Sequence, residues 1–174
     1  MITLYSIHVF SDYLLVKAVE ISEPDPEPVD PDYGFTSVDD RDEALIYTGT
    51  WHDDNNASFS EGTARYTNST DASVVFSFTG TSIRWYGQRD TNFGTAEVYL
   101  DDELKTTVDA NGAAEAGVCL FEALDLPAAE HTIKIVCKSG VIDIDRFAYE
   151  AATLEPIYEK VNALSDRITY VGNW

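Results

Sequence analysis

The sequence predicts an all-β protein: a jelly-roll β-sandwich with an N-terminal β-hairpin extension and a C-terminal strand. The first observation is strict alternation in residues 74–101, where Val74, Phe76 and Phe78 share one face of a strand. The second is the near-regular spacing of turn residues, including a turn expected at Thr79-Gly80-Thr81. The third is the scarcity of helical periodicity, which we expect only as a turn within residues 155–164.

Short alternating segments follow one another along most of the chain. Residues 52–58 are expected to form a polar loop, and the last two strands are expected to pair as a closing hairpin around Ser139-Gly140. The expected strands are 43–47, 59–67, 74–78, 83–85, 96–100, 104–108, 118–124, 131–138 and 141–149.

Composition divides the chain into four parts. Residues 1–22 predict a hairpin, and residues 23–37 alternate proline with acidic residues, so they predict an extended linker. Residues 38–150 form the jelly-roll domain, and residues 151–174 are a further linker and a strand.

A short repeat links the domain to the C-terminus. The segment YTGTW at residues 47–51 returns as YVGNW at residues 170–174, and the hairpin 7–21 resembles residues 135–149. We interpret the chain as one whole domain flanked by the edges of neighbouring repeats. The terminal strands would then have unpaired edges and favour strand addition to other copies or subunits; the alternative is that they pack back on the parent domain.

Charge limits the partners. Eleven Lys and Arg against 31 Asp and Glu give a formal net charge of −20, which excludes nucleic acid and anionic membranes as partners. The longest apolar runs are far below the roughly 20 residues of a membrane helix. The N-terminus lacks the basic and apolar regions of a secretory signal. Cys119 and Cys137 are either buried thiols or a disulfide, so the redox compartment stays open.

Five motifs carry a resemblance to a known family. These are YTGTW at 47–51, FSFTGTSI at 76–83, the strand 94–101, HTIKI at 131–135 and IDIDRF at 142–147. Over residues 38–150 the chain resembles galactose-binding-like jelly rolls, which include carbohydrate-binding modules and the repeated modules of bacteriophage tail and virion proteins. The turn Asp101-Asp102-Glu103 departs from the usual Asp-Gly, and the resemblance supplies an exposed loop surface without specific binding residues.

Loop residues are the candidates for carbohydrate binding, which needs aromatic rings beside planar polar groups. The best cluster is Arg89 and Asn92 beside Phe93, because a guanidinium and an amide can both engage neighbouring hydroxyls. Trp51 and His52 are the other candidates, with Trp51 alternatively packing at the edge of the core. Further polar loop residues are Asn55, Asn56, Gln88 and Asp90.

A structural Ca²⁺ is implied by the resemblance, since similar modules often hold calcium between the entry of the chain and the last strand. The predicted ligands are Asp39, Asp42, Asp143 and Asp145, with Asp40 and Glu43 nearby. The alternative is that Asp145 pairs with an arginine or caps a turn.

Enzyme motifs are missing: the sequence has no Gly-x-Ser-x-Gly and no His or Cys pairs at metal spacing. We therefore expect a non-catalytic jelly-roll module of a surface-displayed or virion structural protein, such as a phage tail protein, which contacts glycans through its loops. Its location would be the virion or the extracellular surface. The alternatives are a carbohydrate-binding module of a secreted glycoside hydrolase and a structural subunit that assembles by strand exchange.

Overall fold

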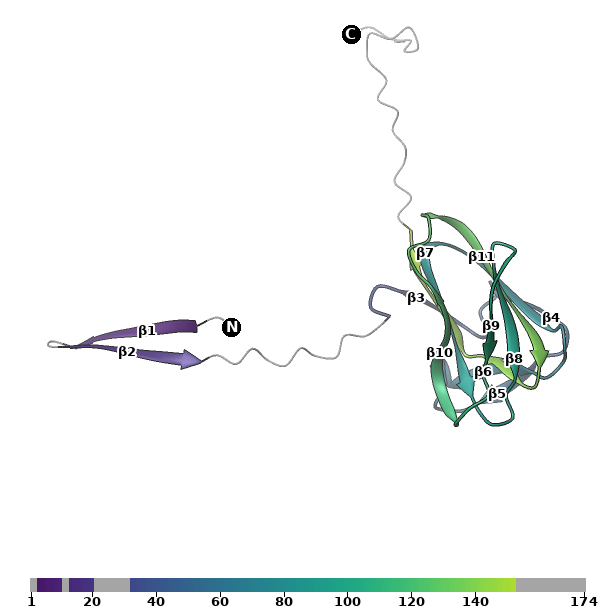
Figure 1. Cartoon of the computed structure of the whole chain (residues 1–174), viewed down its shortest axis with the longest axis horizontal. Helices are drawn as coiled ribbons and strands as arrows, with labels where there is room; N and C mark the ends of the chain where they lie inside the picture. The colour runs from purple at the N-terminus through teal and green to yellow at the C-terminus, as the bar shows by residue number, and fades with distance from the viewer. Residues whose placement is uncertain (1–2, 11–12, 21–31, 153–174) are drawn as a thin grey trace, which may run out of the picture. The chain divides into compact units, whose positions relative to one another are not determined.

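The computed structural model describes residues 3–10, 13–20 and 32–152, and the chain divides into two units, Met1–Tyr33 and Gly34–Trp174 (Figure 1). The first unit contains the antiparallel hairpin of β1 (Thr3–Phe10) and β2 (Tyr13–Glu20), in which Thr3 pairs with Glu20. The predicted N-terminal hairpin is therefore confirmed. The expected helical turn at 155–164 and the repeated strand at 170–174 lie outside the described residues, so strand exchange stays a prediction.

The second unit is an antiparallel β-sandwich, as predicted, with one short 3-10 turn, η1, among its described residues. None of the described residues belongs to a helix long and apolar enough to span a membrane. Its elements are β3 (Thr36–Asp39), β4 (Ile46–Thr48), β5 (His52–Asn55), η1 (Ser60–Gly62), β6 (Thr63–Thr67), β7 (Ser73–Arg89), β8 (Thr95–Leu100), β9 (Glu103–Asp109), β10 (Glu115–Ala123), β11 (Ala129–Ser139), β12 (Ile142–Ile144) and β13 (Arg146–Ala151).

Strand β7 is shared by both layers of the sandwich. Its first half pairs with β4 and β11, and its second half pairs with β10 and β13. From β11 the first layer continues through β8 to β9, and from β13 the second layer continues to β3. A separate sheet of β12, β6 and β5 completes the domain next to the end of β7.

The expected turn at Thr79-Gly80-Thr81 is wrong, because β7 runs through it as one strand of 17 residues. Gly80 instead marks the point where β7 passes from one layer to the other, and it pairs with both Ala129 and Ala151. A Cβ at Gly80 would lie 2.5 Å from the carbonyl oxygen of Glu150, so glycine here permits close backbone approach.

Two other expectations are also corrected by the pairing. The closing hairpin does not form, since β11 pairs with β7 and β8, whereas β12 pairs with β6 and β13 with β3 and β7. Residues 52–55 of the expected polar loop form strand β5, whose four side chains are all exposed. An exposed polar strand carries no apolar alternation, so the pattern could not reveal it.

The core lies between the layers. The alternation of β7 and β8 is confirmed, since Val74, Phe76, Phe78 and Val98 are all buried, and Trp85 is fully buried. The indole N–H of Trp85 donates to the carbonyl oxygen of Asp143, which satisfies its polar atom inside the core. Neither cysteine forms a disulfide: Cys137 is buried on β11 and Cys119 is exposed on β10.

Replacing Gly80 by Ala should destabilise the domain by about 2 kcal/mol, because the added methyl group overlaps the backbone of β13. Urea unfolding would measure the loss. Gly112→Ala is the matched control, since the atom nearest to its Cβ would be 3.7 Å away on Arg89. Equal stability of the two variants would contradict the crossing-point role of Gly80.

Candidate functional site

Three connecting segments meet at one end of the sandwich and enclose a cavity of about 400 Å³. The segment after β7 is held to the one after β11, because the N–H of Gly94 donates to Val141 O and the N–H of Val141 donates to Asn92 O. Phe93 and Val141 also form a parallel bridge. The β5–β6 hairpin supplies the third wall. Backbone hydrogen bonds thus fix the loops that line the cavity.

Aromatic and polar groups line this cavity together. Tyr66 and Phe93 supply rings, and Gln88 and Asn92 supply side-chain amides that make no hydrogen bond among the described residues. Planar amides beside aromatic rings are suited to a ligand that carries hydroxyls on an apolar ring. The full lining is Asp53, Asp54, Tyr66, Gln88, Asp90, Asn92, Phe93, Val141 and Asp143.

The predicted carbohydrate-binding residues separate into two groups. Asn92 and Phe93 line the cavity, and His52 lies beside it, with its ring 5.3 Å from that of Tyr66. Arg89 does not line the cavity: it is exposed beside Gly112, because alternation along β7 turns neighbouring side chains to opposite faces.

Trp51 packs at the edge of the core, which is the alternative that the sequence left open. Its ring lies 4.9 Å from that of Tyr47 in an edge-to-face contact, and its indole N–H donates to Thr48 O. No ring or polar group of Trp51 belongs to the cavity wall.

Sequence reasoning missed Tyr66, Asp53 and Asp54 as site residues. They sit on β5 and β6, and β6 places Tyr66 opposite Asp143 of β12. The three lie far from Asn92 in the sequence. The available signal was the polar and aromatic composition of 52–66, but only the pairing of β6 with β12 brings it beside the loop after β7.

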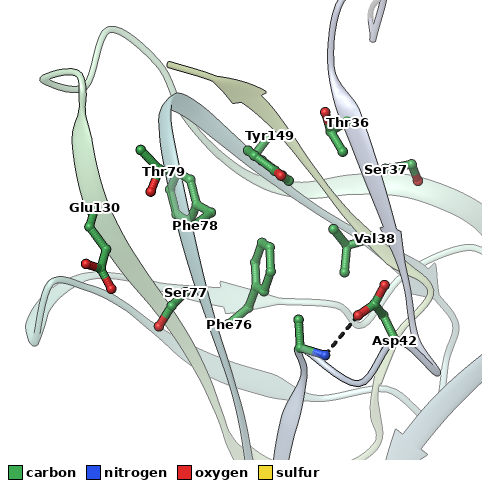
Figure 2. A pocket seen from close by; sticks show the side chains of 11 residues that line it. Thr36, Ser37, Val38, Asp42, Phe76, Ser77, Phe78, Thr79, Glu130 and Tyr149 are labelled. Atoms are coloured by element: carbon green, nitrogen blue, oxygen red, sulfur yellow. Dashed lines mark hydrogen bonds between the residues drawn. The ribbon is translucent and has the colours of Figure 1, made fainter. Parts of the chain in front are cut away.

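A second cavity of about 460 Å³ opens between β3, β7 and β13, and Figure 2 shows its lining. The rings of Phe76, Phe78 and Tyr149 face one another there at 5.7 to 5.9 Å between centroids. Phe76 and Phe78 are each only 4% exposed. Their ring faces are thus already packed in the core, and this larger cavity offers little aromatic surface to a ligand.

The predicted calcium ligands occupy different surroundings. The carboxylate of Asp42 accepts the N–H of Ala44 in an exposed turn (Figure 2), and that of Asp145 accepts the N–H of Ser60. Asp143 accepts the N–H of Gln88 at the cavity. Within the described residues no three or more Asp, Glu, His or Cys are arranged to hold a metal.

Asp39 and its neighbour Asp40 form a carboxyl pair beside Thr63. The hydroxyl of Thr63 donates to Asp40 Oδ1 at 2.6 Å, while Oδ2 of both aspartates is buried without a hydrogen-bond partner. These two oxygens fit a cation only in part, because Arg41 Nε already lies 4.0 Å from Asp40 Oδ2 and a third acidic ligand is missing from the arrangement. Calcium stays a prediction.

Burial raises the pKa of three aspartates in the domain. It raises the pKa of Asp40 to about 6, with the adjacent Asp39 adding to the shift. Burial, together with the negative charges of Asp145 and Asp54, raises the pKa of Asp143 to about 7 against the lowering effect of the hydrogen bond from Gln88. Burial likewise raises the pKa of Asp145 to about 6.

His131 is a structural histidine at the start of the HTIKI segment. Its Nδ1 lies 2.7 Å from Asp101 Oδ2 and its Nε2 lies 2.8 Å from Pro127 O. Burial opposes the charged form, but these two contacts outweigh it and raise the pKa of His131. Burial also disfavours the charged form of Asp101, yet the bonds from His131 and the N–H of Thr132 lower its pKa overall.

Sequence comparison finds enzymes as relatives. No protein-family model matches the chain. The "A type blood alpha-D-galactosamine galactosaminidase" of Flavonifractor plautii is 99% identical over 165 residues, which cover 95% of this chain and 15% of that protein. The "A type blood N-acetyl-alpha-D-galactosamine deacetylase" of the same organism is 55% identical over 122 residues, 70% of this chain and 16% of that protein. The chain thus spans only about a sixth of the curated relatives that it matches.

Structural comparison finds the same architecture in carbohydrate-active proteins. A cycloisomaltooligosaccharide glucanotransferase of Paenibacillus sp. matches with a TM-score of 0.54 at 15% identity, covering 68% of this chain and 18% of that one. An exo-β-1,3-galactanase of Phanerochaete chrysosporium matches with a TM-score of 0.51 at 17% identity, covering 66% and 29%. At these identities the likeness shows the fold alone: a β-sandwich of the kind found in carbohydrate-active proteins.

These findings correct the expected location. The relatives are named as carbohydrate-active enzymes of a bacterium, so the placement in a virion is wrong. The expected link with phage tail modules has no support among them. The resemblance to carbohydrate-binding jelly rolls holds at the level of the fold.

Stability of the domain should fall by at least about 2 kcal/mol between pH 5 and pH 7.5. The raised pKa values of Asp40, Asp143 and Asp145 mean that the folded state binds more protons than the unfolded state in this window. His131, also raised, loses its stabilising charge in the same direction. Urea unfolding with a chelator present would measure the slope, and stability that rises with pH would contradict the shifts.

Asp143→Asn supplies the specific test of that slope. The amide oxygen can still accept the Gln88 N–H, but one titrating group is gone, so the slope should become shallower while Asp40, Asp145 and His131 keep the remainder. Asp102→Asn, a change of equal charge at an exposed turn, should leave the slope as in the wild type.

Proposed function

We propose that this chain is a non-catalytic carbohydrate-binding module of a glycan-processing enzyme. The observation that carries the proposal is the cavity at the end of the sandwich, where the rings of Tyr66 and Phe93 lie with the unpaired amides of Gln88 and Asn92. An aromatic ring packs on the C–H face of a sugar, while the amides reach its hydroxyls. The carbohydrate-active context of the fold supports this proposal.

The two curated relatives add a functional argument. One is named for cleaving galactosamine and the other for deacetylating N-acetylgalactosamine, both of A type blood. A segment shared by enzymes named for different reactions supplies something that both reactions need. We propose that this is attachment to the glycan, which raises the local concentration of substrate at a separate catalytic domain.

Asn92→Ala and Gln88→Ala should each weaken glycan binding at least about tenfold, because each removes a hydrogen bond to the ligand. Titration calorimetry with glycans selected on an array would measure the change. Stability should change by less than about 1 kcal/mol, since neither amide bonds to the protein.

Arg89→Ala is the matched control, because Arg89 neighbours Gln88 on β7 but lies outside the cavity lining. Its glycan affinity should equal that of the wild type. A selective loss of binding in Arg89→Ala, with Asn92→Ala unaffected, would move the binding surface to the opposite face of β7.

Calcium is tested apart from glycan binding. If Asp39 and Asp40 hold Ca²⁺ through their orphaned oxygens, adding CaCl₂ to chelator-treated protein should raise the melting temperature by several degrees. Asp39→Asn should abolish the rise, and Asp102→Asn should keep it. An unchanged melting temperature on adding CaCl₂ would rule out calcium at Asp39 and Asp40.

A further inference from the structure

The cavity of the proposed site is lined by acidic side chains. Carboxylates of Asp53, Asp54, Asp90 and Asp143 line it, and no Lys, Arg or His is among its lining residues. They come from three separate segments, so the acidic groups converge on one partly open cavity. Partly enclosed walls focus such a field and favour a cationic ligand.

Protein partners neutralise only part of this charge. Arg65 Nε lies 3.2 Å from Asp53 Oδ1, and Asp90 accepts the N–H and the hydroxyl of Thr91. Asp54 has neither an ion pair nor a hydrogen bond from its carboxylate within the described residues. Asp54 and Asp143 both line the cavity, and the negative charge of Asp54 helps to raise the pKa of Asp143.

Asp143 distinguishes this cavity from an ordinary acidic surface, because its side chain is buried. It is 2% exposed and lines the cavity, and its Oδ1 accepts the N–H of Gln88 at 2.8 Å. A buried carboxylate costs free energy unless donors or a cation meet it, so a cationic ligand group in the cavity would stabilise the charged form of Asp143.

We infer that the cavity selects amino sugars whose amine is free and protonated, with the ammonium group on the acidic wall to which Asp54 and Asp143 belong. This inference rests on the proposed function and names its ligand class. An ammonium group offers three donors and a positive charge, which match two carboxylates that lack basic partners. The sugar ring lies against Phe93 or Tyr66, where the ring face also favours a nearby cation.

Competing sugars fit the same wall less well. A neutral hexose brings hydroxyl donors but no charge, and an N-acetylated sugar replaces the ammonium with a neutral amide that donates only one hydrogen. A uronic acid would meet like charges on every side. The negative wall therefore discriminates by charge, and the Tyr66 and Phe93 rings accept any of these sugars.

The test is titration calorimetry of the whole 174-residue chain with galactosamine, N-acetylgalactosamine, galactose and galacturonic acid, in low salt with EDTA. We expect galactosamine to bind at least tenfold more tightly than the other three, and that advantage to shrink as salt is added. Asp54→Asn and Asp143→Asn should each lower the affinity ratio of galactosamine to galactose. Asp102→Asn, the control of equal charge outside the cavity, should keep the ratio.

Each other outcome has a distinct meaning. If galactose or N-acetylgalactosamine binds as tightly as galactosamine, the proposed function stands and the amine selectivity is wrong. If none of the sugars and no glycan on an array binds, both fail. If galactosamine binds only when calcium replaces EDTA, a metal and not the amine occupies the acidic wall, and the inference is overturned. Asp54 is exposed, so Asp54→Asn remains a test even if Asp143→Asn does not fold.

Discussion

Backbone pairing along β7 sets the position of every layer in the sandwich. One strand donates to and accepts from four others, β4 and β11 on its first half and β10 and β13 on its second. This sharing requires a residue without a Cβ at Gly80, where the backbone of Glu150 comes closest. Once β7 spans both layers, its far end at Arg89 delivers the following loop to the edge of the β5–β6 hairpin.

Backbone hydrogen bonds next to the end of β7 hold the loops of the cavity in place. The loop after β7 is held to Val141 by two backbone hydrogen bonds: Gly94 N–H donates to Val141 O, and Val141 N–H donates to Asn92 O. The buried carboxyl group of Asp143 accepts the N–H of Gln88. Loops held in this way lose little conformational freedom when a ligand binds, so more of the interaction energy is available as affinity. Asp143, which accepts the Gln88 N–H, is also one of the acidic groups that line the cavity.

Buried carboxylates recur as internal acceptors in this domain. Asp145 holds the 3-10 turn through the N–H of Ser60, and Asp40 meets the hydroxyl of Thr63. Each hydrogen bond links segments distant in sequence, at the cost of taking a carboxyl group out of water. The chain is acidic overall, but these few acids differ from the solvated majority because they have specific donors.

Alternation along Val74, Phe76 and Phe78 identified buried strands, because inward and outward side chains differ in polarity whatever their strand partners are, and the regular turn spacing added the fold class. Composition likewise pointed to Asn92 and Phe93 in an exposed loop. Only the tertiary structure decided that β7 continues through Gly80, that Arg89 lies outside the cavity lining, and that Asp54 and Asp143 line the same cavity. Which strands pair, and which loop residues line a cavity, depends on contacts between segments distant in the sequence. The local sequence pattern does not specify those contacts.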